Sequence, residues 1–372
     1  MSSISTNIHF GAKYLRNNYF PSNKKILIVT SQSFEKNKIL KELTEVLISN
    51  ENSVKKCFKE SNIKEPNSDY INKLKGQIEG DFDLIIGVGG GSVMDITKFL
   101  SFLLVSNNKC EDYDLNKNQI MDSIPLILIP TTCGSGSEVT QYAVATNSIT
   151  KRKFTVSSEY IRPQKCFIFP EFLYSLSYKS IIDSSIDAFI HSFEAFMNHS
   201  NVDLLFKTIS IDGMRIISEV LQNYSETKIL TKEMTVELAS ASLYGGMSIS
   251  NYRTGMVHTI SVALSEYSDQ PHGFLNGKIF NEVLSFNNKA YGNKLILAAN
   301  KVFNKDVDNI SDAHNLFSNF ISSFFKNEKI AFITKPDINH LIDRINQDSG
   351  LPDVNPLKFN NSNLKTIINK II

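Results

Sequence analysis

The chain has 372 residues, of which 42% are hydrophobic and 21% are charged. At about 150 residues per domain, this length predicts two domains and excludes a single small module. The composition is that of an ordinary globular protein, with enough apolar residues for a large core. The 39 basic and 38 acidic residues leave a formal net charge of +1. Because nucleic-acid-binding proteins carry a clear excess of basic residues, we expect no nucleic-acid partner.

The cysteine content and the apolar segments indicate the compartment. The four cysteines show no Cys-x-x-Cys spacing and are too few for a disulfide framework, which favours a reducing compartment. The densest apolar stretch, Phe99 to Val105, is much shorter than the roughly 20 residues needed to cross a membrane. Residues 1–10 have neither the basic flank nor the apolar run of a signal peptide. We therefore expect a cytoplasmic protein with no membrane partner.

The first half of the chain alternates β-branched apolar runs with segments of helical period. This alternation predicts a parallel sheet that helices cover on both faces. The predicted strands are 25–30, 54–58, 83–88 and 124–129, and the predicted helices are 34–49, 67–78 and 93–105.

Strand signals fade after about residue 175. Apolar residues there recur mostly at intervals of three and four, which predicts helices. We expect these near 180–198, 203–222, 231–250, 255–266, 274–287, 292–302, 309–326 and 336–348. The sequence thus predicts an α/β domain over residues 1–176 and an all-helical domain over residues 177–372.

A glycine-rich turn follows the strand predicted at 83–88. Gly89, Gly90, Gly91 and Ser92 open the next helix, where small residues let the backbone approach a ligand and free amides favour a phosphate. The dinucleotide fingerprint would have glycine in place of Ser92. The alternative is a tight turn with Ser92 as the helix N-cap. Asp95, expected at the third helical position, either complements the helix dipole or makes a specific polar contact.

A second loop, Pro130 to Thr140, follows the strand predicted at 124–129. It contains five hydroxyl side chains, two glycines and a thiol. Ligands of α/β proteins bind at the carboxyl ends of parallel strands, so this loop is a candidate binding loop. The alternative is a surface loop with ordinary turn chemistry.

Three histidines and an aspartate form a candidate metal-binding set. Asp187 and His191 lie four apart on a predicted helix and therefore project from one face. His258 belongs to the segment 256–264, and His272 lies in the turn Pro271-His272-Gly273. A carboxylate with three imidazoles suits Fe(II), Zn(II), Mn(II) or Ni(II). Taken singly, each histidine is more typical of a surface or a hydrogen-bonded core position.

In combination, these motifs resemble those of the iron-containing alcohol dehydrogenases, the metal-dependent group III family. The resemblance runs from about Phe10 to Asn355-Pro356 and covers nearly the whole chain. It implies an N-terminal dinucleotide-binding α/β domain of Rossmann-like type, a helical metal-binding domain, a site between them, and a homodimer. The matching stretches are Gly89–Ser92 with Asp95 and Lys98, Pro130–Thr140, Lys151–Phe154, Asp187–His191, Val257-His258 and Pro271–Gly273.

The resemblance also implies individual roles. Asp187, His191, His258 and His272 would hold one divalent metal, with iron expected first and zinc or another divalent ion as alternatives. Leu176 would lie against the nicotinamide, and Lys153 would reach the nearby ribose. The residues that would contact the rest of the dinucleotide are Gly89, Gly90, Gly91, Ser92, Asp95, Thr131, Thr132, Ser135 and Thr140.

Three positions depart from the family pattern. Val262 stands where many members have a second histidine, so a proton relay through that ring is absent. Ser31 ends the first predicted strand where members commonly have an aspartate that excludes a 2′-phosphate, so both NAD(H) and NADP(H) remain possible. Arg253 stands where a small residue is usual, five residues before His258 and roughly 7.5 Å away if both lie on one helix. Its guanidinium would bind an anionic substrate, or it is a solvated loop arginine.

The function implied is metal-dependent, NAD(P)-linked alcohol dehydrogenation or aldehyde reduction of a small substrate. Arg253 suggests a phosphonate, phosphate or carboxylate group on that substrate. Three alternatives remain: a dehydroquinate synthase-like cyclase, which is a lyase, a metal-free reductase, and a catalytically silent nucleotide-binding protein. The cyclases have Glu in place of the Asp187 and His191 pair, and the other two classes would not need all four metal ligands.

Overall fold

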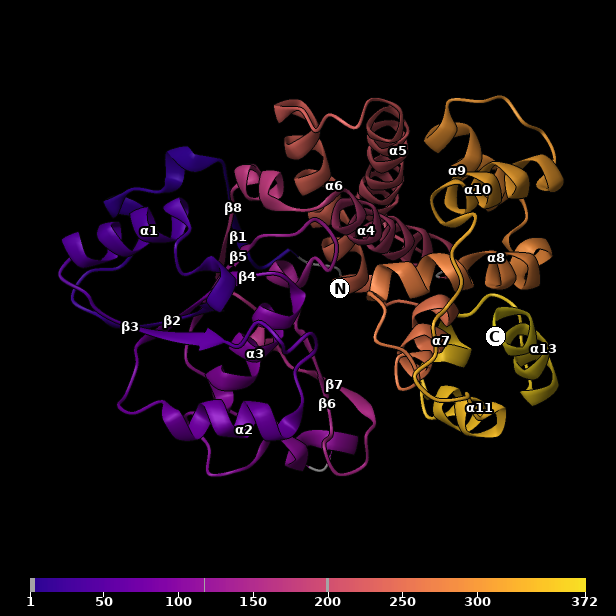
Figure 1. Ribbon diagram of the computed structural model, residues 1–372. Helices are drawn as coiled ribbons and strands as arrows, with labels where there is room; N and C mark the ends of the chain where they lie inside the picture. Colours follow the sequence, from indigo (N-terminus) through magenta and orange to yellow (C-terminus); the bar gives the residue numbers. More distant parts are fainter. Residues whose placement is uncertain (1–3, 117, 199–200) are drawn as a thin grey trace. The chain divides into compact units, whose positions relative to one another are not determined.

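The computed structural model describes residues 4–116, 118–198 and 201–372. The chain divides into two compact units, which are described separately (Figure 1). The α/β unit ends at Phe172, and the helical unit contains Leu173–Ile372 together with the short segment Cys133–Ser135. Within the described residues, no helix combines the length and the apolar character needed to span a membrane.

A six-stranded parallel sheet forms the centre of the α/β unit. Its strand order is β1-β8-β5-β4-β2-β3, and all paired neighbours run parallel. This confirms the predicted fold class. The strands are β1 (Asn7–Phe10), β2 (Lys25–Ser31), β3 (Ser53–Lys59), β4 (Leu84–Gly89), β5 (Leu126–Pro130) and β8 (Lys165–Ile168).

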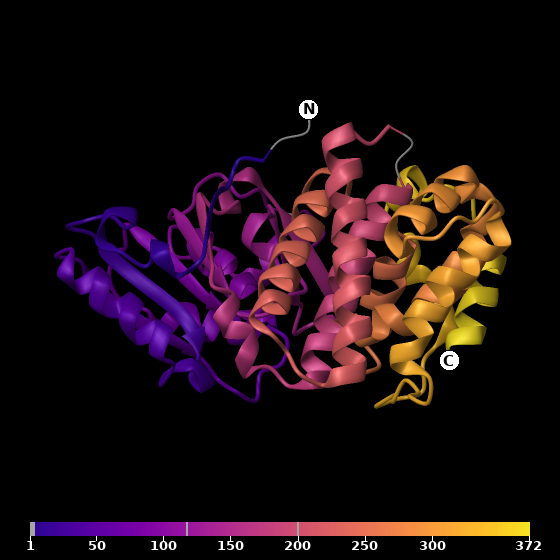
Figure 2. The ribbon, with the colours of Figure 1, turned by 90° about the horizontal axis from the view of Figure 1, so that it is seen from above.

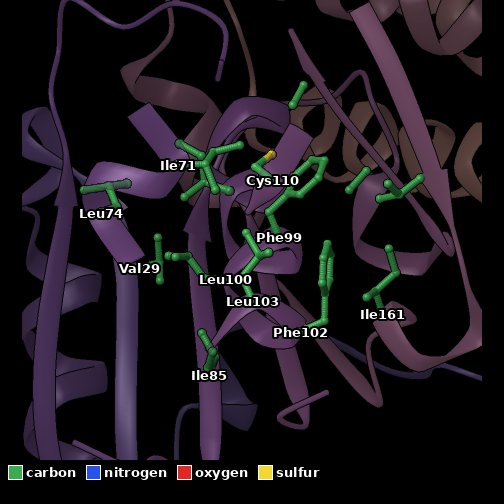
Figure 3. Close-up of a cluster of buried hydrophobic side chains, with 14 of the residues drawn as sticks. Val29, Ile71, Leu74, Ile85, Phe99, Leu100, Phe102, Leu103, Cys110 and Ile161 are labelled. Atoms are coloured by element: carbon green, nitrogen blue, oxygen red, sulfur yellow. The ribbon is translucent and has the colours of Figure 1, made fainter. Parts of the chain in front are cut away.

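Alternate residues of the central strands pack on opposite faces of this sheet. On β2, Ile26 and Ile28 join the apolar cluster that includes Leu40 and Leu47 of α1 (Lys38–Ser49). Leu27 and Val29 join the cluster on the other face, where α2 (Ser68–Gln77) and α3 (Gly91–Leu103) pack (Figure 3). Because both faces of the sheet are buried, its central strands are continuous apolar runs. These runs allowed the central strands to be predicted from the sequence.

Several elements of the α/β unit were not predicted. The strands β6 (Tyr142–Thr146) and β7 (Lys153–Ser157) form an antiparallel hairpin, and β1 and β8 extend the sheet. The hairpin buries Ala143, Ala145, Phe154 and Val156 in the cluster shown in Figure 3. Short 3-10 helices are η1 (Ala12–Tyr14), η2 (Asn17–Tyr19), η3 (Gln32–Phe34), η4 (Cys110–Asn116), η5 (Ser137–Val139), η6 (Glu159–Ile161) and η7 (Pro170–Ser175).

The start of α3 differs from the prediction. Gly90 is the N-cap and Gly91 is the first helical residue, so Ser92 lies inside the first turn and does not cap the helix. Asp95 consequently lies in the second turn, where interaction with the helix dipole is weaker than at the third position.

The helical unit confirms the prediction for the second half of the chain. The long helices α4, α5 and α6 lie side by side (Figure 2). The helices are α4 (Tyr178–Asn198), α5 (Leu204–Thr227), α6 (Lys232–Tyr252), α7 (Met256–Leu264), α8 (His272–Tyr291), α9 (Asn293–Phe303), α10 (Ile310–Phe325), α11 (Ile338–Asn346), α12 (Leu351–Val354) and α13 (Asn361–Ile371). The last two were not predicted. Helix α4 is buried along most of its length and contacts α5, α6 and α8.

Candidate active site

Three of the four residues expected to bind a metal form a buried cluster in the helical unit. Asp187 and His191 lie one turn apart on α4, and His258 is the third residue of α7. Asp187 Oδ1 lies 4.0 Å from His191 Nε2 and 3.5 Å from His258 Nε2. One donor atom from each residue lies within 4.8 Å of the other two. Three potential ligands from two helices therefore converge on one point.

His272 adjoins this cluster from a third helix. It is the first residue of α8, one residue inside the helix instead of in the preceding turn as expected, and its ring centroid lies 5.4 Å from that of His258. The next residue, Gly273, packs so closely on α4 that a Cβ atom there would lie 1.8 Å from the carbonyl oxygen of Asp183. Only glycine permits this approach, which places the start of α8 against Asp187 as well, since the added Cβ would lie 3.1 Å from Asp187 Cβ.

The cluster is electrostatically polarised. Burial alone would raise the pKa of Asp187, but the surrounding histidines outweigh it and hold that pKa well below its usual range. Burial lowers the pKa of His191 to about 4. Burial would also lower the pKa of His258, but Asp187 and Glu194 outweigh burial and raise it to about 9. The Asp187 carboxylate is therefore ionised, and cations or hydrogen-bond donors must balance its negative charge.

The donor set fits a divalent transition metal. Two ligand atoms held about 2.0 to 2.2 Å from one ion lie no more than about 4.4 Å apart. The distances of 4.0 and 3.5 Å from Asp187 Oδ1 to His191 and His258 satisfy this limit. Imidazole nitrogen with one carboxylate oxygen suits iron, zinc, manganese or nickel. Because the cluster is buried, a bound ion would replace water as the partner of these atoms.

Sequence reasoning missed Glu194, which contacts this cluster. Its side chain is 1% exposed, and Oε2 lies 2.7 Å from His258 Nδ1. The same carboxylate accepts hydrogen bonds from the backbone amides of Gly255 at 2.8 Å and Val257 at 2.6 Å. Glu194 lies three residues after His191 on α4. Nothing near it in the sequence indicates a partner on α7, so no local signal could have identified it.

Asn276 was missed for the same reason. It lies one turn after His272 on α8 and is fully buried. Its Nδ2 donates to Asp187 Oδ1 at 2.7 Å and lies 3.1 Å from His258 Nε2. The amide therefore contacts the two atoms that are aimed at the candidate metal position. The available signal was that Asn276 lies four residues after His272, because this spacing places both side chains on one helix face.

The glycine turn lies at the carboxyl edge of the sheet in the α/β unit. Gly89 ends β4, and a Cβ atom there would lie 2.5 Å from Val93 Cβ, so this glycine allows α3 to pack against its own strand. Gly90 lies next to Thr132, whose Cγ2 would be 3.1 Å from an added Cβ. Strands β4 and β5 are neighbours, with Gly89 paired to Pro130. The two candidate loops therefore lie side by side, as expected for one binding surface.

A fully buried lysine anchors the second candidate loop, Pro130–Thr140, which we call the hydroxyl loop. Lys98 Nζ donates to Ser137 O at 2.7 Å and to Thr140 O at 2.9 Å. It also lies 2.8 Å from Tyr142 O, 2.9 Å from Ser137 Oγ and 3.1 Å from Thr140 Oγ1. Thr131 and Thr140 of this loop are buried, and Thr132 is half-buried. Ser135 is part of the short segment Cys133–Ser135, which belongs to the helical unit. Lys98 thus ties this loop to the helix that carries the glycine turn.

Two further candidates for cofactor binding have partners inside the α/β unit. Asp95 accepts a hydrogen bond from the backbone of Val144 in β6, and burial raises the pKa of its carboxyl group while Lys98 opposes that rise. Lys153 begins β7 and forms a 2.6 Å ion pair with Glu65. These contacts connect the hairpin to the rest of the unit. They give Asp95 and Lys153 a structural role whether or not a cofactor is bound.

Ser31 and Leu176 are both half-buried. Ser31 is the last residue of β2, next to Lys59 of β3 in the strand register, and its Oγ hydrogen-bonds Ser33 Oγ at 2.8 Å. The side chain is half-buried and carries no charge. Leu176 is half-buried in the segment between η7 and α4.

Arg253 is already ion-paired. Its Nη2 lies 2.9 Å from Asp348 Oδ1, and Thr259 donates to the other oxygen of that carboxylate at 2.9 Å. Arg253 is the C-cap of α6, with φ +58°, while α7 begins at Met256. Arg253 and His258 therefore do not share one helix, and the spacing of roughly 7.5 Å along a helix axis does not apply to them. The side chain is 46% exposed.

Comparison with known proteins covers both units. A sequence profile described as iron-containing alcohol dehydrogenase matches residues 5–170, and one described as Fe-containing alcohol dehydrogenase family, C-terminal, matches residues 181–372. A 4-hydroxybutyrate dehydrogenase of Clostridium kluyveri is 32% identical over 221 residues, 59% of this chain and 59% of that protein. A sulfoacetaldehyde reductase of Bilophila wadsworthia is 30% identical over 252 residues, 67% of this chain and 64% of that protein. The matched regions thus span about three fifths of these relatives.

Solved structures share the fold over the full length. An iron-containing alcohol dehydrogenase from Thermococcus thioreducens has a TM-score of 0.87 at 19% identity, with 100% of this chain and 99% of that chain covered. A 1,3-propanediol oxidoreductase has a TM-score of 0.84 at 20% identity, with both chains fully covered. At this identity the likeness establishes the fold alone. Together with the two sequence profiles, it shows that the chain belongs to the iron-containing alcohol dehydrogenase family.

Proposed function

We propose that this chain catalyses reversible hydride transfer between NAD(P)(H) and the carbinol or carbonyl carbon of a small alcohol or aldehyde. Asp187, His191, His258 and His272 would hold one divalent metal ion. The observation that carries this proposal is the buried convergence of Asp187, His191 and His258, with His272 beside it. Burial of the polar side chains of Asp187, His191 and His258 has a cost that a shared ion would offset, and His272 beside them is half-buried.

When bound, the divalent ion would act as a Lewis acid on the substrate oxygen and favour the alkoxide near neutral pH. The protein residues have separate tasks. Asp187 supplies the negative charge that balances the ion, and the three imidazoles supply neutral nitrogen donors. Glu194 and Asn276 hold the donor atoms in place through the hydrogen bonds to His258 and Asp187. Burial of the cluster limits access of water to the reacting atoms.

The dinucleotide would bind at the carboxyl edge of the parallel sheet. We assign the pyrophosphate to the turn Gly89–Ser92 at the N-terminus of α3, where free amides favour negative charge. Thr131, Thr132, Ser135 and Thr140 supply hydroxyl groups, Lys153 reaches a ribose, and Leu176 lies against the nicotinamide. Ser31 has no charge to repel a 2′-phosphate, so we propose that both NAD(H) and NADP(H) are accepted.

Proton exchange cannot use a second histidine on α7, because Val262 occupies that position. The remaining groups for this step are water, the hydroxyl groups of the cofactor ribose or another side chain. This distinguishes the chain from members that have a histidine there.

We propose further that the substrate carries an acidic group. Two of the relatives are named for substrates with a carboxylate and a sulfonate, 4-hydroxybutyrate and sulfoacetaldehyde. Arg253 is the candidate partner for that group, and it would have to exchange its ion pair with Asp348 for the substrate. The lyase alternative has no support, since both profiles describe alcohol dehydrogenases.

A substrate panel tests the proposed activity. Neutral and anionic aldehydes of matched length would be offered with NADH or NADPH to protein loaded separately with Fe(II), Zn(II), Mn(II) or Ni(II). Consumption of the reduced nicotinamide, followed by its near-ultraviolet absorbance, is the readout. We expect at least one aldehyde to be reduced in a metal-dependent way. No turnover with any combination would contradict the proposed function.

A further inference from the structure

We propose that Glu194 is a positioning residue that fixes the ring of His258 as a metal ligand and joins that ring to the N-terminus of α7. This inference rests on the proposed metal-binding function, since it concerns how one ligand of that metal is held. Neither carboxylate oxygen of Glu194 points at the candidate metal position. Both oxygens are engaged with residues 255–258.

The carboxylate of Glu194 serves as the missing cap of α7. The N-cap residue, Gly255, has no side chain to accept the free amides at the helix start. Glu194 Oε2 accepts the amide of Gly255 at 2.8 Å, and Oε1 accepts that of Val257 at 2.6 Å. Because α4 also carries Asp187 and His191, this contact fixes the start of α7 relative to those two ligands.

The same carboxylate decides which nitrogen of His258 carries a proton. An ionised carboxylate only accepts hydrogen bonds, so His258 Nδ1, 2.7 Å from Oε2, must be the protonated nitrogen. Nε2 faces Asp187 Oδ1 at 3.5 Å, and it is the nitrogen at which a bound metal would replace the proton. A second neighbour agrees, because Nε2 lies 3.1 Å from the Nδ2 donor of Asn276. Carboxylate–histidine contacts of this kind orient metal ligands and increase their basicity.

His272 has a hydroxyl group beside its ring. Its Nδ1 lies 3.1 Å from Ser261 Oγ, and a hydroxyl group can either donate or accept. That contact does not determine the tautomer. His258 has its metal-facing nitrogen set by a charged partner, so removal of the Glu194 carboxylate should be detectable in the affinity for metal.

The Glu194→Gln variant separates these effects because an amide cannot replace both oxygens. If the amide oxygen takes the place of Oε2, its NH₂ group faces the N–H of Val257. If it takes the place of Oε1, the NH₂ group faces His258 Nδ1 and forces the proton onto Nε2. The first arrangement places two hydrogen-bond donors against each other. The second puts a proton on the nitrogen that would bind the metal. Loss of an outer-shell contact of this type lowers metal affinity by about 10- to 100-fold.

A matched control removes a helix cap far from the ligands. Thr231 is the N-cap of α6, and its Oγ1 accepts the amide of Met234 at 3.2 Å. The Thr231→Ala variant should therefore lower the melting temperature by a few degrees through the lost cap. It should leave metal affinity within about twofold of the wild type. If Glu194 acts only as a cap, its variant should behave in the same way.

The experiment titrates metal-free full-length protein with Zn²⁺ against a coloured chelator, for the wild type, Glu194→Gln and Thr231→Ala. We expect tight binding by the wild type and by Thr231→Ala, and binding about 10- to 100-fold weaker by Glu194→Gln. Equal affinity of all three proteins would overturn the role of Glu194 and leave the proposed function intact. Failure of the wild type to bind Zn²⁺, Fe²⁺ or Co²⁺ would overturn the proposed function itself.

A second measurement decides the matter even if Glu194→Gln does not fold. Zinc-loaded wild-type protein labelled with ¹⁵N in its histidine rings reports the state of each nitrogen by NMR, and His258→Gln assigns the signal. We expect a protonated Nδ1 and an unprotonated, metal-bound Nε2 for His258. Metal bound through Nδ1 would overturn the proposal.

Discussion

The imidazole rings of His191 and His258 stack with their centroids 4.5 Å apart and their planes 15° from parallel. One ring comes from α4 and the other from α7, so this arrangement depends on the packing of two helices. Both rings are buried beside Asp187 Oδ1. Stacked rings with their nitrogens at one carboxylate oxygen match a shared ion better than they match an apolar core.

Changing Ser31 to Asp should shift cofactor preference toward NAD(H). A carboxylate at the end of β2 would repel the 2′-phosphate of NADP(H), which we expect the wild type to accept. The change in preference should be about 1 to 2 kcal/mol, or roughly 5- to 30-fold in the ratio of specificity constants. Steady-state kinetics with both cofactors measures it.

Ser49→Asp is the control for this comparison. It places the same charge on the exposed last residue of α1 and should leave the preference unchanged. Strict use of NAD(H) by the wild-type protein would refute this account of Ser31.

Changing Lys98 to Met should destabilise the α/β unit by about 3 kcal/mol or more. The variant would leave the carbonyl groups of Ser137, Thr140 and Tyr142 buried without their donor. Urea unfolding measures the loss, and Lys75→Met is the control. Lys75 also donates to two loop carbonyls, at Ser106 and Asn108, but near the surface. A similar small loss in both variants would show that Lys98 is not the anchor of the hydroxyl loop.

Glu138 should make the protein less stable as pH rises. Burial raises the pKa of its carboxyl group from its usual value near 4.5 to about 7, with Lys98 opposing the rise. Between these values the folded protein keeps a proton that the unfolded chain releases. Stability contributed by this group is therefore complete below pH 4.5 and is lost as pH rises through 7. The loss amounts to about 3 kcal/mol at most.

The Glu138→Gln variant lacks this titration. Subtracting its free energy of unfolding from that of the wild type at pH 5, 6, 7 and 8 isolates the contribution. We expect the wild type to lose stability relative to the variant across this range, whereas Glu226→Gln, at the exposed end of α5, should run parallel to the wild type. A difference that does not change with pH would mean that Glu138 stays ionised beside Lys98.

Local patterns in the sequence were sufficient for four of the six strands of the sheet and for part of the site. The apolar run on β2 predicted a strand buried on both faces, and Ile26 and Leu27 do lie in clusters on opposite faces. The spacing of Asp187 and His191 predicted that they share a helix face, and their ligand atoms lie 4.0 Å apart. Such inferences succeed because helix and strand periods fix side-chain direction over a few residues.

Contacts between distant segments could not be predicted in this way. Glu194 meets His258 because α4 packs beside α7, and no periodicity within either helix encodes that packing. Lys98 was noticed as part of a family motif, but its acceptors at 137–142 lie in a loop whose path the sequence does not specify. The hairpin β6–β7 was missed although Lys153–Ser157 alternates polar and apolar residues, which is a local strand signal.

Changing Arg253 to Ala should affect anionic substrates selectively. If its guanidinium binds an acidic group, the specificity constant for an anionic aldehyde should fall by about 30-fold, or about 2 kcal/mol, with little change for a neutral aldehyde. Arg215→Ala, which removes a surface arginine of α5 paired with Asp212 and Glu219, should change neither. Equal losses on both substrates, or none, would rule out anion binding and leave Arg253 as the partner of Asp348.

The most direct test of the central claim is metal removal from wild-type protein and from the His258→Ala variant. Chelator-treated wild type should lose turnover and regain it on addition of Fe(II) under exclusion of oxygen. Dinucleotide binding, followed by fluorescence, should persist because the residues that we propose for it lie largely in the α/β unit. His258→Ala should bind metal more than about 100-fold more weakly, beyond the loss typical of an outer-shell contact, and should not recover. Undiminished turnover by the metal-free wild type, or by metal-free His258→Ala, would contradict the account.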